Sequence, residues 1–63
     1  MVRLMVWSIF FTWKDGTRDT LDADGISERD ITIRSMKSRG EFTEISYCKK
    51  YSNGDRGELV KSL

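Results

Sequence analysis

Apolar and polar positions divide the chain into extended segments, short turns and one ambiguous segment. Residues 2–13 carry β-branched and aromatic side chains at both odd and even positions, with no Ala, Glu or Lys among them. A strand that is buried on both sides shows this pattern, whereas a half-exposed strand alternates cleanly. We therefore expect residues 2–13 to form the central strand of a sheet.

The dipeptide Asp15-Gly16 follows this segment and predicts a hairpin with a two-residue turn of type I′. Segment 17–23 would then return as an edge strand, because its many charges discourage further pairing. This turn places Phe10 opposite Leu21, and alternation sorts the side chains onto two faces. One face would hold Met5, Trp7, Ile9, Phe11 and Trp13, and the other Leu4, Val6, Ser8, Phe10 and Thr12 with Leu21 and Ala23.

Residues 25–40 fit either a helix or a strand. A helix from 28 to 39 is favoured by a pair resembling a capping box, a possible hydrophobic staple and a closing glycine. The residues concerned are Ser27 with Asp30, Ile26 with Ile31, and Gly40. Against the helix, the alternating β-branched run in residues 30–36 is typical of a strand. We expect the helix and keep an all-β fold, with residues 30–36 as a strand, as the alternative.

The last third of the chain predicts a second hairpin. Residues 41–51 read as a strand with Ile45, Tyr47 and Tyr51 on one face and Phe42 out of phase. An Asn-Gly pair at 53–54 supplies a turn, and residues 57–63 a short closing strand with Leu59 and Leu63 inward. The expected fold is therefore α+β: a small antiparallel four-stranded sheet with one short helix packed on one face, in the order ββαββ.

The length of 63 residues corresponds to a single small domain, 1–63, that buries little surface on its own. With Cys48 as the only cysteine and no histidine, a disulfide within the chain is excluded and a zinc site is disfavoured. Association or an unusually well-packed core is the remaining source of stability. One helix cannot cover both faces of the sheet, so we expect the row from Met5 to Trp13 to be the uncovered face and a second copy to cover it.

Candidate chemistry is sparse. Without histidine no Ser–His–Asp or Cys–His arrangement is possible, and the five glycines all fit turns and form no phosphate loop. The acidic run "DTLDADG" fails as a calcium loop, because Thr20 and Ile31 fall at the first and twelfth ligand positions. We expect no enzymatic activity, no cofactor and no metal. The opening apolar run lacks a cleavage site and is too short to span a membrane, which predicts a cytoplasmic protein without membrane contact.

The sequence thus favours a small protein–protein interaction module of the inhibitor or adaptor type, self-associating as a homodimer. Trp7, Phe11 and Trp13 are the partner-binding candidates, because buried aromatics dominate interface energetics. The alternative is nucleic-acid binding by the second half, where residues 31–63 carry seven Lys and Arg against four Asp and Glu. Its candidate residues are Arg34, Lys37, Arg39, Tyr47, Lys49, Lys50 and Tyr51.

In general style the chain resembles the short, compact proteins encoded by bacteriophages and mobile elements. It shares with them the absence of histidine and proline, the single cysteine and the hairpins around one helix. No motif connects it with a named family, so the resemblance assigns no functional residues.

Overall fold

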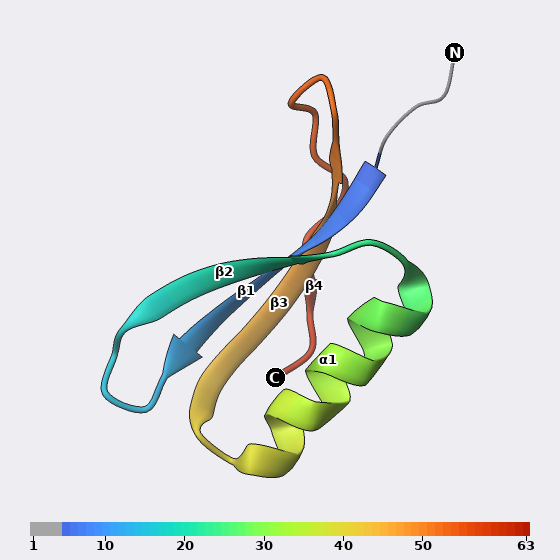
Figure 1. Ribbon diagram of the computed structural model, residues 1–63. Coiled ribbons are helices and arrows are strands. Elements are labelled where there is room, and N and C mark those ends of the chain that lie inside the picture. The colour runs from blue at the N-terminus through green and yellow to red at the C-terminus, as the bar shows by residue number, and fades with distance from the viewer. Residues whose placement is uncertain (1–4) are drawn as a thin grey trace.

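The computed structural model of the protein describes residues 5–63 as one antiparallel sheet with one helix on one side of it (Figure 1). The strands are β1 (Met5–Trp13), β2 (Arg18–Ala23), β3 (Phe42–Tyr51) and β4 (Val60–Lys61), and the helix is α1 (Ile26–Arg39). Their order in the sheet is β2-β1-β3-β4, so the apolar strand β1 is central. The expected α+β fold in the order ββαββ is confirmed, although β4 is only two residues long.

The first hairpin has a three-residue loop instead of the expected two-residue turn. Trp13 N–H donates to Thr17 O at 2.7 Å, and Gly16 closes the loop with φ +92°. No residue other than glycine has positive φ in the range 5–63, so the type I′ turn is wrong. The longer loop shifts the register by one residue, and Leu21 lies opposite Ile9 instead of Phe10. A one-residue shift moves every side chain of β2 to the other face.

This shift decides which face of the sheet is the core. Leu21 and Ala23 join the row Met5, Trp7, Ile9, Phe11 and Trp13, and α1 covers that row. Ile9 and Ala23 are fully buried there, beneath Ile33 and Met36 of the helix. The expectation that this row is the uncovered face is therefore wrong. Leu4, assigned above to the opposite face, lies outside the described residues.

Strand β3 pairs with β1 along its whole length, which places Ile45 opposite Phe11 and Tyr47 opposite Ile9 on the helix side. The register shifts between Thr12 and Trp13, so that Trp13 lies opposite Phe42. This irregularity returns Phe42 to the core face, where it is 7% exposed. The phase break seen at Phe42 in the sequence is thus a β-bulge.

The ambiguous segment is a helix, and the strand alternative for residues 30–36 is wrong. Its N-cap is Gly25 instead of Ser27, and Glu28 accepts a hydrogen bond from the Asp24 N–H at 2.7 Å. Ile26 and Ile31 are 59% and 65% exposed, so they form no buried staple. Gly40 ends the helix as expected, in the left-handed region with φ +66°.

The second hairpin repeats the construction of the first. Tyr51 N–H donates to Asp55 O at 2.9 Å across the loop 52–54, and Gly54 has φ +95°. The β3 end of this hairpin projects beyond the helix (Figure 1). Past it, Val60 pairs with Tyr47 at the edge of the sheet. The expectation that Leu59 and Leu63 point inward is wrong, since they are 58% and 51% exposed.

Candidate interaction surface

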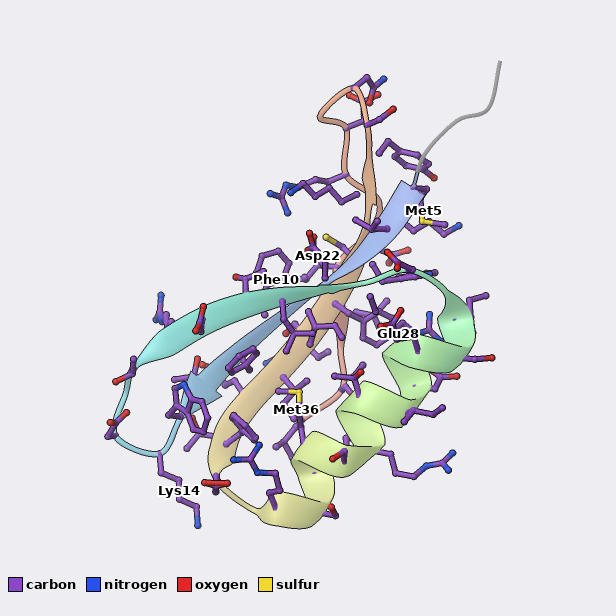
Figure 2. All side chains as sticks on the ribbon, in the orientation of Figure 1. Met5, Phe10, Lys14, Asp22, Glu28 and Met36 are labelled. Carbon is purple, nitrogen blue, oxygen red and sulfur yellow. The ribbon has the colours of Figure 1, made fainter. Side chains whose placement is uncertain are left out.

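The face of the sheet opposite α1 is covered by no element of residues 5–63, and we call it the open face. Figure 2 shows Met36 directed from the helix toward the sheet, whereas Phe10 lies on the side away from the helix. Cross-strand partners share a face, so the register defines the members of the open face. They are Val6, Ser8, Phe10 and Thr12 of β1, Arg18, Thr20 and Asp22 of β2, Glu44, Ser46, Cys48 and Lys50 of β3, and Lys61 of β4.

The middle of the open face is an open groove of about 830 Å³. Phe10 is half-buried in its wall, between Thr20 of β2 and Ser46 of β3. Arg56, from the segment before β4, reaches over the groove with its guanidinium 5.6 Å from the centre of the Phe10 ring. The groove therefore combines one aromatic side chain with a cation.

Below Arg56 the floor of the groove consists of small side chains. Cys48 is 3% exposed and Ser8 is 1% exposed, and the two lie opposite each other in neighbouring strands. The Ser8 hydroxyl donates to Asp22 Oδ1 at 3.1 Å, so its burial leaves it with a partner. Arg56 Nη1 lies 4.0 Å from Cys48 Sγ. The Ser8 and Cys48 side chains are therefore almost completely covered within the chain itself.

Charges surround the groove in both signs. Arg18, Lys50, Arg56 and Lys61 are basic, whereas Asp22 and Glu44 are acidic. None of these six groups takes part in the ion pairs of residues 5–63, which join Arg29 to Asp30 and Arg39 to Glu41. The rim thus presents charges without counter-charges within the described chain.

The structure places two of the three predicted partner-binding aromatics in the core. Trp7 and Phe11 are each 7% exposed beneath α1. Trp13 is half-buried at the end of β1, with its ring centre 4.5 Å from that of Phe42. All three lie on the helix side, so none contributes to the open face.

The predicted nucleic-acid residues do not share one surface. Arg34 and Lys37 are exposed on the helix, and Arg39 pairs with Glu41 at 2.7 Å. Of the β3 candidates, only Lys50 lies on the open face. The remaining three, which are Tyr47, Lys49 and Tyr51, lie on the helix side.

An unpredicted feature of the helix side is the position of Arg29. Its guanidinium lies 4.4 Å from the ring centre of Trp7 and 4.6 Å from that of Tyr47. The side chain is only 14% exposed, and it also pairs with Asp30 at 2.7 Å. Trp7 Nε1 is buried without an acceptor among the described residues, and Lys49 Nζ lies 5.7 Å from the same ring. Arg29 lies on the same face of the helix as Ile33 and Met36, four and seven residues before them. This spacing could have identified Arg29 in the sequence as a residue that faces the core.

Other chemistry in the described residues is limited. In residues 5–63 no three His, Cys, Asp or Glu side chains gather as a metal site, and no helix is long and apolar enough to cross a membrane. Asp15 is a turn residue: the Thr17 N–H donates to its Oδ1 at 2.9 Å and holds the pKa of its carboxyl below the ordinary value.

Comparison with known proteins gives no match. No protein-family model fits the sequence, and neither a curated protein nor a solved structure matches it significantly. The function is therefore inferred from the surfaces of the molecule itself.

Proposed function

We propose that the protein is a small, non-enzymatic binding module of the inhibitor or adaptor type that docks on another protein through its open face. One observation carries this proposal: a single helix covers one face of a four-stranded sheet, and no other element of residues 5–63 covers the opposite face. On that face Phe10 stands beside a groove and charges form the rim. An aromatic centre within a polar rim is the usual anatomy of a protein–protein interface.

The mixed charge of the rim supports a protein partner. Asp22 and Glu44 would lie against phosphates if a nucleic acid occupied the same face, and such contacts are repulsive. A protein surface, in contrast, can offer both signs of charge to match them. We place the module in the cytoplasm, where a lone buried thiol such as Cys48 stays reduced.

Nucleic-acid binding remains a second candidate because of one specific arrangement. The open face carries four basic residues against two acidic ones, and a half-buried aromatic such as Phe10 beside a cation such as Arg56 can stack a base. This mode predicts that affinity falls steeply as salt is added, since phosphate contacts release counterions. A protein partner held by an aromatic anchor would depend less on salt.

The test is capture of partners by the immobilised protein, with Phe10→Ser as the test variant. The matched control is Ile31→Ser, which makes the same kind of change on the exposed helix surface, where Ile31 is 65% exposed. We expect a discrete protein that is retained by the wild type and by Ile31→Ser, lost by Phe10→Ser and unaffected by nuclease. Far-UV circular dichroism confirms that both variants are folded.

Two results would contradict the proposal. Retention that Phe10→Ser leaves unchanged would remove the open face as the docking surface. Retention that nuclease abolishes, together with a steep salt dependence, would replace the protein partner with a nucleic acid.

A further inference from the structure

We infer that the occupant of the open face is a second copy of this chain, docked face to face about a two-fold axis that lies across the strands. This inference rests on the proposed function, because it names the partner of the same surface. Its basis is the order of charges along β2 and β3. A two-fold interface requires a surface that is complementary to itself.

The charges of the two strands run in opposite directions along the open face. Thr12 of β1 lies between Arg18 and Glu44, so one end of the face is basic on β2 and acidic on β3. Toward the other end Asp22 makes β2 acidic and Lys50 makes β3 basic. Both strands therefore reverse their sign from one end to the other.

The reversal makes the face complementary to itself about a two-fold axis that lies between Phe10 with its cross-strand partners and Ser8 with its cross-strand partners. This axis superimposes the Glu44 end of one copy on the Lys50 end of the second copy, and the contact occurs twice. Arg18 comes within two residues of the second copy's Asp22 in the same arrangement, and Arg56 comes within two residues of the second copy's Lys61. The second contact repels, so the attraction rests on the Glu44–Lys50 contacts.

Lys50 and Arg56 give a second reason to expect a carboxylate from a second copy on this face. The two residues lie directly opposite each other across an isolated bridge, and like charges in this position repel. Neither has an ion pair among residues 5–63. Glu44 cannot supply the charge within one copy, because six residues of strand separate it from Lys50 by about 20 Å. Glu44 of a second copy can.

The size of the face predicts a weak dimer. Because β4 has only two residues, the three long strands with six or seven residues each define the face, which spans roughly 14 by 22 Å, or about 300 Å² of projected area on each copy. Specific interfaces usually bury at least about 1,000 Å² in total. We therefore expect a transient dimer that forms only at high protein concentration rather than a permanent assembly.

The experiment is a charge swap followed by sedimentation equilibrium over a range of protein concentrations. Glu44→Lys or Lys50→Glu alone places two like-charged contacts in every dimer, and each should weaken dimerisation at least about tenfold. The double variant Glu44→Lys with Lys50→Glu restores both contacts with their signs exchanged. Its dissociation constant should return to within about threefold of the wild type, and so should that of the control Arg34→Glu, which reverses a charge on the exposed helix surface.

Salt provides a second readout on the wild type, which does not depend on the folding of any variant. Charges at the rim are screened, so dimerisation should weaken between 0.05 and 0.5 M NaCl, as expected from a Debye length of about 10 Å at 0.1 M. A wild-type dimer whose stability does not change with salt would contradict the paired charges. Circular dichroism of each variant separates loss of association from loss of fold.

Three results would overturn the inference. A strictly monomeric protein at millimolar concentration would remove the second copy, and the proposed function would survive if Phe10→Ser still abolished capture of a different protein. A dimer that ignores both single charge reversals would instead use another surface, such as the exposed edge of β2. A double variant as weak as the single ones would refute this two-fold arrangement.

Discussion

Replacing Arg29 with alanine tests the least expected part of the core. The guanidinium lies over the rings of Trp7 and Tyr47, at 4.4 and 4.6 Å from their centres. Only 14% of the side chain is exposed, so solvent screens these contacts weakly. Alanine would remove both contacts and leave the two rings without their cover.

The expected loss of stability follows from these contacts. A cation over an aromatic ring contributes about 0.5–1 kcal/mol when exposed and about 2 kcal/mol when desolvated. The Asp30 carboxylate adds little, because it is 51% exposed and such pairs contribute about 0–1 kcal/mol. We therefore expect Arg29→Ala to lower the free energy of unfolding by about 2–3 kcal/mol. A 63-residue domain has only about 3–9 kcal/mol in total.

Urea unfolding followed by far-UV circular dichroism measures this loss without relying on the fluorescence of Trp7. The matched control is Arg34→Ala, which removes the same side chain from an exposed position of α1 and should change stability by less than about 0.5 kcal/mol. A double-mutant cycle of Arg29→Ala with Tyr47→Leu should give a coupling of about 0.5–2 kcal/mol. Equal stabilities of Arg29→Ala and Arg34→Ala, or a coupling of zero, would refute the stacked arrangement.

Three further changes probe the turn and the core. Gly16→Ala should cost about 1–2 kcal/mol in urea unfolding, because φ is +92° and the open space around the glycine excludes a steric clash as the cause. An unchanged midpoint would refute this turn geometry. The Asp15 carboxylate stabilises the turn above the pKa of the unfolded chain, and this contribution disappears as pH falls through its lowered folded pKa. The amide shift of Thr17 in an NMR titration should therefore move at a pH below the ordinary pKa of an aspartate. Trp7→Ala should cost about 3–5 kcal/mol by the same unfolding measurement, whereas half-buried Trp13→Ala should cost less; the reverse order would contradict the observed core.

Loop length explains why the faces could not be assigned from the sequence. Asp15-Gly16 and Asn53-Gly54 each mark a hairpin, yet the same dipeptide serves two-residue and three-residue loops. The difference depends on one hydrogen bond, Trp13 N–H to Thr17 O, which no local pattern shows. Because the side-chain period of a strand is two, this single residue moved Leu21 to the opposite face and with it the expected core.

Helix geometry shows a similar division. Gly40 ended the helix where local chemistry required it, whereas the N-cap fell on Gly25 and the serine expected there was not used. Packing against the sheet, rather than the sequence of the helix, decides which side of α1 faces inward. Arg29, Ile33 and Met36 share that side, and a cation can occupy it only because two rings from β1 and β3 lie beneath it.

The sequence by itself determined the class of fold, because the signals for it are local. The apolar periodicity, the Asp-Gly and Asn-Gly turns and the glycine that ends the helix each depend on only a few neighbouring residues. The sequence also predicted the central position of β1, the most apolar segment of the chain, although only one side of that strand lies under the helix. Only the tertiary structure decided the register, the covered face, the bulge at Trp13 and the open face with Phe10. These features depend on contacts between residues far apart in the chain, such as Trp13 with Phe42, and a local pattern carries no information about them.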